Sequence, residues 1–339
     1  MDQRISAGVD LYRKQSDASK YTLYQNWVTG GTVRVGLPIT DRFSISGRYS
    51  LYSSQIKIPN TATQPYDDCT SDGTSNIGAF SGVGTSTTNC LTNGEASLAV
   101  KEIRGTTITS LGGYTLAYNN LDDTKNPSNG YYAEVKQDVA GLGGNSHFVK
   151  TTGQARYYHE LYDNFVGFVK VQGGNVFGYG SKELRLVDNF NLGPDLVRGF
   201  APSGIGPRDI SSGTNSSTNG LGGTNYVGGT AEIQFPIFGM PREMGLKAAI
   251  FADAGTLFGY TGQTNFGTGA CVPSGSPNYT QATCIDLGNT TKPVIRSSVG
   301  ASLIWASPLG PIRFDYAFVL SKAEYDVKQA FRFTGGASF

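Results

Sequence analysis

The chain has 339 residues, of which 16% are charged, and its formal net charge is +1. This balance offers no electrostatic footprint for nucleic acid, so we expect no nucleic-acid partner. No stretch of about 18 apolar residues occurs, which excludes a helical membrane protein. The 46 Gly, 19 Tyr and 18 Phe favour strands. A transmembrane β-barrel stays compatible with this composition, because only every second residue of a spanning strand faces lipid.

The N-terminus carries no apolar segment of the kind that opens a signal peptide. Met1 is followed directly by Asp2, Gln3 and Arg4. Because an outer-membrane protein needs a signal peptide, we interpret Met1 as the start of an expressed or processed fragment.

Apolar and polar residues alternate with period two in twelve segments, as expected of strands that expose two different faces. The clearest example is 311–320 (PIRFDYAFVL), in which Arg313 and Asp315 alternate with apolar residues. The segments lie at about 3–13, 21–39, 42–58, 102–119, 130–141, 146–161, 164–178, 225–238, 245–259, 293–306, 311–321 and 328–339. We expect the following residues to face lipid: Val299, Ala301, Leu303, Ile312, Phe314, Tyr316 and Phe318.

The connections between these segments alternate in length. Every long connection follows an odd-numbered segment, at 59–101, 179–224 and 260–292. The connections after the even-numbered segments are short. Transmembrane barrels have short periplasmic turns and long extracellular loops, and single-chain bacterial barrels have an even number of strands. The sequence therefore predicts an all-β, antiparallel transmembrane β-barrel. A soluble β-sandwich is the alternative, but it gives no reason for this sorting of loop lengths.

The four cysteines form two local pairs, Cys69 with Cys90 and Cys271 with Cys284. Both pairs fall in long polar loops, and C-x₂-C spacings typical of zinc sites are absent. We predict two loop-closing disulfides formed in an oxidising compartment. Each would stabilise the fold by about 3 kcal/mol. Four free thiols are the alternative.

The sequence gives no indication of an enzyme. Its two histidines, His147 and His159, lie at a strand start and a strand end, and neither has a metal-ligand partner nearby in sequence. We interpret both as loop or rim residues. P-loop, G-x-S-x-G and dinucleotide-binding motifs are also missing. We therefore expect no catalytic residues, no metal site and no cofactor.

Several motifs in the C-terminal half occur in a recognisable order. Val197-Arg198-Gly199-Phe200 (VRGF) lies late in the 179–224 loop, and Gly228-Gly229-Thr230-Ala231-Glu232 begins the next strand. They are followed by FADAGTLF (251–258), IWASPLGPIRFDYAF (304–318) and FRFTGGASF (331–339). Together these motifs resemble the BamA-type outer-membrane surface antigen family, and the resemblance covers essentially the whole chain.

The resemblance implies a location in the bacterial outer membrane and a role in folding and inserting other outer-membrane β-barrels. Its implied partners are the lipid bilayer, nascent barrel proteins and accessory assembly lipoproteins. The family barrel has sixteen strands preceded by periplasmic POTRA domains. Residues 1–339 are then one barrel domain, without the POTRA domains that dock the lipoproteins and without the first four strands. The alternatives are a secretion transporter of the same superfamily and a plain pore-forming barrel.

The loop motif leads to a residue-level hypothesis. Alternation places Glu232 and Asp253 on the lumen faces of two neighbouring antiparallel strands, at similar depth. Two adjacent carboxylates repel each other unless a cation lies between them, and a guanidinium suits that position because it is planar and always charged. We predict that Arg198 folds into the lumen and pairs with both acids. Gly199 would permit a tight turn, and Phe200 would pack on an apolar patch. The alternative is an exposed loop arginine and two unrelated acids.

The last segment resembles the C-terminal recognition signal of outer-membrane barrels. Phe331, Phe333, Gly335 and Phe339 share one face, and the chain ends on an aromatic residue. The alternative is a lipid-facing stripe that ends in an interfacial aromatic. We expect frayed pairing at Gly335 and Gly336, because glycine has no side chain to pack in a strand. The family's lateral gate, a weak seam between its first and last strands, requires such fraying.

Overall fold

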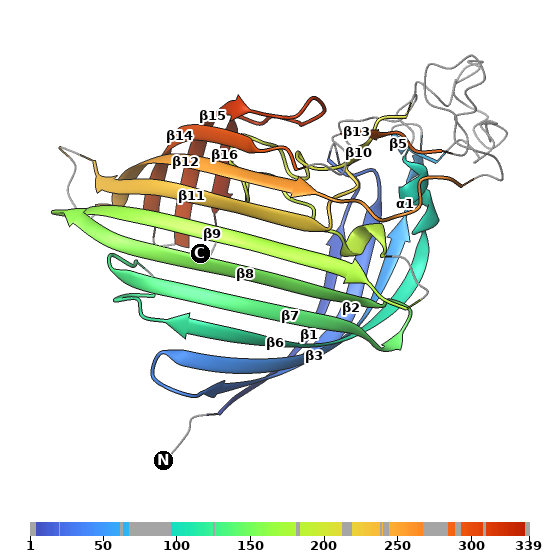
Figure 1. Ribbon diagram of the computed structural model, residues 1–339, viewed down its shortest axis with the longest axis horizontal. Helices are drawn as coiled ribbons and strands as arrows, with labels where there is room; N and C mark the ends of the chain where they lie inside the picture. The colour runs from blue at the N-terminus through green and yellow to red at the C-terminus, as the bar shows by residue number, and fades with distance from the viewer. Residues whose placement is uncertain are drawn as a thin grey trace.

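A computed structural model of the chain describes residues 5–19, 21–61, 64–67, 96–124, 126–180, 184–211, 219–237, 239, 244–266, 284–288, 293–307 and 310–335. Its main feature is one antiparallel sheet in which each strand pairs with the next main strand along the chain (Figure 1). The twelve strands are β1 (Ser6–Ser16), β2 (Gln25–Pro38), β3 (Phe43–Lys57), β6 (Gly105–Asn119), β7 (Gly130–Gly144), β8 (Phe148–Tyr162), β9 (Phe165–Gly178), β11 (Asn225–Pro236), β12 (Leu246–Phe258), β14 (Arg296–Ser307), β15 (Gly310–Ser321) and β16 (Phe331–Gly335).

The twelve predicted segments correspond one to one with these strands. The largest differences are that β2 begins four residues later than 21–39 and that β16 covers only Phe331–Gly335 of 328–339, whose residues 336–339 lie outside the described part of the chain. Up to β15, every main strand has 11 to 15 residues. A tilted strand needs about 9–11 residues to cross a bilayer.

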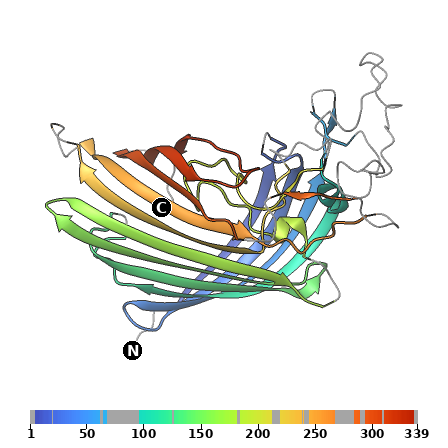
Figure 2. The same cartoon turned by 45° about the horizontal axis from the view of Figure 1, so that its top comes forward.

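The sheet curves strongly, so that it has a concave and a convex face (Figure 2). β1 and β16 are its two edge strands and do not pair with each other within the described residues. The described sheet is therefore a barrel wall with one open seam. No described helix is long and apolar enough to cross a membrane.

The three long connections join strands at one end of the sheet, the loop end, where the shorter β1–β2, β7–β8 and β15–β16 connections also lie. The short turns after β2, β6, β8, β11 and β14 are at the other end, the turn end (Figure 1). At the loop end the long connections contain short elements that alternation did not predict. These elements are β4 (Asn60–Thr61), β5 (Gln64–Pro65), α1 (Leu98–Glu102), η2 (Leu186–Asp188), β10 (Arg208–Asp209) and β13 (Leu287–Gly288). Apolar residues of the long connections and of the β1–β2 connection form a buried cluster of Leu23, Ala96, Ala99, Val100, Leu186, Leu221 and Ile285. Four separate connections thus pack into one cap.

A second buried cluster fills the space between the 179–224 connection and the concave face of the sheet. The connection supplies Leu184, Phe190, Leu196, Val197, Phe200 and Ile205, and the wall supplies Leu111, Ala140, Phe148, Val176 and Leu257. We call this connection the lumen loop. Its apolar residues are buried because they pack against the inner wall.

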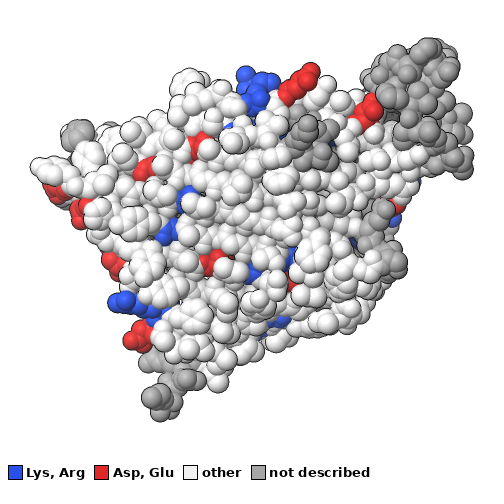
Figure 3. All heavy atoms as spheres, viewed as in Figure 1, with Lys and Arg blue, Asp and Glu red and all other residues white. Residues whose placement is uncertain are grey.

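The convex face carries the predicted lipid-facing residues. Val299 is 37% exposed, Tyr316 50% and Phe318 60%, whereas the intervening Ser298 and Ala317 are buried. The part of this face in view over β7 to β12 is mostly uncharged (Figure 3). An apolar outer face and a polar inner face are the arrangement expected of a membrane barrel.

Of the four cysteines only Cys284 lies in the described residues, and it is disulfide-bonded. Cys69, Cys90 and Cys271 lie outside them. The two predicted pairings stay predictions.

Candidate functional site

The lumen loop brings Arg198 against the inner wall of β11 and β12. Nε and Nη2 of Arg198 donate to Oδ2 and Oδ1 of Asp253 over 2.7 and 2.8 Å, and the backbone amide of Arg198 donates to Oδ2 over 3.0 Å. One carboxylate thus holds both the side chain and the backbone of Arg198. Such bidentate, charge-assisted bonds fix orientation as well as position.

Glu232 joins Arg198 to a second arginine. Nη1 of Arg198 and Nη2 of Arg313 each donate to Oε2 of Glu232 over 2.7 Å. Arg313 also donates through Nε to Asp315 Oδ1 over 2.7 Å. The carboxylates are almost completely buried, with side-chain exposures of 1% for Glu232, 2% for Asp253 and 5% for Asp315. Two arginines and three carboxylates therefore form one buried network, the Arg198 cluster.

The guanidinium of Arg198 also lies over an aromatic ring. Its Cζ is 3.5 Å from the ring centroid of Phe251, a cation–π contact. Phe251 faces Gly300 of β14 in the strand register. A Cβ at Gly300 would lie 2.5 Å from Cζ of Phe251 and 2.2 Å from the carbonyl oxygen of Tyr316. The ring can occupy this position only because residue 300 is glycine.

The other motif residues fasten the loop beside the Arg198 cluster. Val197 and Phe200 are 0% and 1% exposed. Gly199 has φ +95°, and a Cβ there would lie 3.0 Å from Val319 and 3.2 Å from Ala317. Only glycine combines this left-handed backbone with so close an approach to the wall.

The lumen loop also bonds to the chain that leads into the last strand. The amide of Gln329 donates to the carbonyl of Gly199 over 2.9 Å, and Ala201 and Val327 are joined by another 2.9 Å bond, from Ala201 N–H to Val327 C=O. Arg332 in β16 forms an ion pair with Asp195 of the loop at 2.8 Å. The VRGF segment and the start of β16 are thus one hydrogen-bonded unit.

The structure brings Arg198 of the loop motif together with Glu232 and Asp253, the two acids that strand alternation placed at similar depth. Phe331 and Phe333 of the predicted terminal stripe are both more than half exposed on the convex face, where Phe333 packs on Phe314 at 5.2 Å between centroids. Gly335 pairs with Ile312. Gly336 and Phe339 lie outside the described residues, so fraying there and a recognition signal stay predictions.

Sequence reasoning missed the roles of Arg313, Asp315 and Phe251. Arg313 and Asp315 were visible as polar residues on the lumen face of 311–320. Their link to Glu232 was not, because β15 is three strands away from β11. The lumen-facing residues of β14 between them, Ser298, Gly300 and Ser302, are small and let Arg313 reach across. A run of small residues between charged strands was the available signal.

The charges of the Arg198 cluster are those of a site that holds the loop in place. Burial alone lowers the pKa of Arg198, but its hydrogen bonds to Asp253 and the charges of Asp253 and Glu232 outweigh burial and raise that pKa above its ordinary value. Arg198 stays charged at any physiological pH. Among the described residues, no three His, Cys, Asp or Glu side chains come together as possible metal ligands. The cluster can hold a loop in place, and nothing in it is arranged as a nucleophile and base.

Comparisons with known proteins agree with this fold. Residues 1–339 match the Omp85 superfamily domain, and the chain belongs to this superfamily. It is 34% identical to the outer membrane protein assembly factor BamA of Neorickettsia risticii, over 98% of this chain and 37% of that protein. It is 25% identical to BamA of Neisseria meningitidis serogroup B, over 99% of this chain and 40% of that protein. The chain therefore spans about two fifths of the length of these relatives.

A solved structure gives the same fold. The crystal structure of BamA from Haemophilus ducreyi lacking POTRA domains 1–3 matches with a TM-score of 0.69 at 18% identity, over 97% of this chain and 58% of that one. The chain is thus an antiparallel barrel of the bacterial outer membrane. These matches confirm the predicted fold class and location. Because barrels of this kind have long extracellular loops and short periplasmic turns, the loop end is assigned to the exterior and the turn end to the periplasm.

Proposed function

We propose that this chain is the barrel of an outer-membrane assembly factor that folds and inserts other β-barrel proteins. Its partners would be the lipid bilayer, nascent barrel proteins and, through periplasmic domains, accessory lipoproteins. The work is physical and requires no covalent step. Two relatives, at 34% and 25% identity, are each named as an outer membrane protein assembly factor, and this supports the proposal.

The observation that carries the proposal is the bonding between the lumen loop and the approach to β16. Gly199 accepts from Gln329, so the loop motif and the start of the last strand move together. β16 is short and pairs on one side only, with Ile312–Tyr316 of β15, within the described residues. An unpaired strand edge is a template for an incoming strand, because unpaired backbone groups in lipid cost several kcal/mol each. The Arg198 cluster would hold that edge in position.

The test is an assembly assay with the protein in proteoliposomes. A nascent barrel substrate is added, and its folding is followed by its heat-modifiable migration. Arg198→Ala should slow assembly, because the loop that positions β16 loses its anchor. Arg104→Ala is the matched control, since Arg104 pairs with Asp67 at the loop end and its side chain is 49% exposed. Equal assembly rates for wild type and Arg198→Ala would contradict the proposal.

Conductance in planar bilayers separates the proposal from a plain pore or a secretion transporter. The lumen loop packs into the wall from Leu184 to Ile205, so the wild-type barrel should conduct poorly. A large, steady conductance together with no assembly activity would favour a pore.

A further inference from the structure

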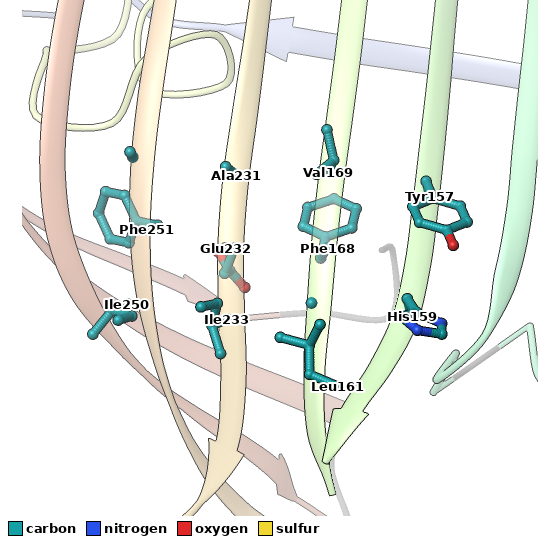
Figure 4. A pocket seen from close by; sticks show the side chains of 12 residues that line it. Tyr157, His159, Leu161, Phe168, Val169, Ala231, Glu232, Ile233, Ile250 and Phe251 are labelled. Carbon is teal, nitrogen blue, oxygen red and sulfur yellow. The ribbon is translucent and has the colours of Figure 1, made fainter.

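The membrane-facing wall contains a hollow of about 450 Å³ on β8, β9, β11 and β12 (Figure 4). It lies outside the barrel, on the face opposite the Arg198 cluster. Its size is within the range of about 300–1,000 Å³ typical of small-molecule sites. We call it the outer groove.

Strand register explains why the wall is hollow there. Ala231 of β11 lies between Val169 of β9 and Ala252 of β12, so two short side chains stand next to each other. One row toward the turn end, Gly167 adds a position without a side chain, between His159 and Ile233. Longer side chains surround this floor, and Tyr157, Leu161 and Ile250 are each more than half exposed.

The medium around the barrel identifies the occupant. The side chains that line the groove from outside are apolar except for His159 and the Tyr157 hydroxyl. An empty hollow of this size in hydrocarbon would leave its lining without dispersion contacts. A flexible acyl chain is the one component of the bilayer that can fill a narrow, irregular apolar groove.

The polar end of the groove indicates which lipid. His159 and Tyr157 stack at 6.2 Å between centroids with planes 14° apart. His159 lies three residues before Tyr162, where β8 ends at the periplasmic turn. Amphipathic rings at this level of a barrel meet lipid headgroups, and an imidazole N–H can donate to a phosphate oxygen.

We propose that the outer groove binds one phospholipid of the periplasmic leaflet, with an acyl chain over Ala231 and Ala252 and its phosphate beside His159. The proposal does not depend on the assembly function, since it rests on the outer face alone. The groove would keep one lipid with the protein through detergent extraction, while other lipids around the barrel exchange freely.

Native mass spectrometry of the detergent-solubilised protein, with added palmitoyl-oleoyl phosphatidylethanolamine, tests the proposal. Wild type should retain one lipid more tightly than all others. The double variant Ala231→Leu/Ala252→Leu fills the floor, and its affinity for that lipid should fall by about tenfold or more. Ala252→Leu alone should give a smaller loss and serves if the double variant does not fold. The control is Ala133→Leu, which adds the same bulk on the convex face of β7, beside Tyr118 and Ala155 and away from the groove, and should leave binding unchanged.

The headgroup is tested separately with His159→Leu and with palmitoyl-oleoylglycerol, which has the same two acyl chains but no phosphate. Wild type should prefer the phospholipid over palmitoyl-oleoylglycerol, and His159→Leu should remove that preference. Retention of the tight lipid by the folded groove variants would overturn the proposal. An equal loss in Ala133→Leu, or no preference for the phospholipid in wild type, would do the same.

Discussion

Arg198 and Arg313 donate to the same oxygen of Glu232, each over 2.7 Å. One arginine comes from the lumen loop and the other from β15, so a single buried carboxylate joins the loop to the wall. Removing one partner of a buried ionic network costs roughly 3–5 kcal/mol, because the remaining charges are left uncompensated.

Glu232→Gln should therefore loosen the lumen loop while the sheet stays folded. Hydrogen–deuterium exchange of residues 195–205 should become faster, and exchange in β7 and β8 should not change. Glu134→Gln is the control, since Glu134 accepts from Tyr132 and Gln154 on the wall itself. Unchanged loop protection in Glu232→Gln would show that this carboxylate does not hold the loop.

Arg198→Lys should restore only part of what Arg198→Ala loses. A lysine keeps the charge, but it cannot bond Asp253 through two nitrogens and reach Glu232 at the same time. Loop exchange and assembly rate should both fall between those of wild type and Arg198→Ala. If the Arg198→Lys variant behaved as wild type, charge alone would be sufficient and the bidentate geometry would have no role.

Gly300→Ala should destabilise the barrel by roughly 1–3 kcal/mol, the usual cost of overpacking. The added methyl would meet the Phe251 ring on one side and the backbone of Tyr316 on the other. Urea unfolding in lipid measures the change. Gly47→Ala, at a strand glycine with no atom within 4 Å of the added Cβ, is the matched control. Equal stabilities of the two variants would mean that Phe251 moves without cost.

Ala301→Arg should destabilise the barrel by roughly 2–4 kcal/mol, because it places a charge on the lipid face near the middle of β14. Ser46→Arg, on the inner face of β3, should cost less because the lumen is polar. Ser298 and Ala317 also face the lumen, but they are buried beneath Gly199 of the lumen loop. An arginine there would meet the loop, so neither position can serve as the control. Similar unfolding free energies for both arginine variants in lipid would argue against the assigned membrane face.

The η2 turn packs in the buried cluster at the loop end through Leu186, and we call this packing its docking. Docking should depend on pH through Asp188. Burial raises the pKa of Asp188 to about 6 from 3.8, against the opposing charges of Arg185 and Lys150. Between these two pH values the docked turn holds a proton that the undocked turn has lost. Docking therefore weakens as pH rises from about 4 to 6, by roughly 3 kcal/mol, and is constant above that range.

Hydrogen exchange of residues 184–190, corrected for the intrinsic rate, checks this dependence at about pH 4.5 and 7.5. Protection should be higher at the lower pH in wild type. Asp188→Asn should remove the difference, because it cannot ionise. A difference that persists in Asp188→Asn would assign the pH dependence to another group.

The sequence by itself determined the twelve strands and which face of each strand points outward. Both follow from local chemistry: a strand exposes alternate residues to two different media, so Val299 and Ser298 must differ. The alternation of long and short connections also predicted which end of the barrel is extracellular and which is periplasmic. The residue types at Glu232 and Asp253 also predicted a cation between them, since two carboxylates at similar depth require one.

Only the tertiary structure decided what lies across several strands. Arg313 reaches Glu232 over the small residues of β14, Phe251 lies on Gly300, and Gln329 meets Gly199 although the two are far apart in sequence. These contacts depend on the curvature of the whole sheet and on where the lumen loop settles. Strand alternation has no information about either, because it reports the face of a residue and not its neighbours two or three strands away.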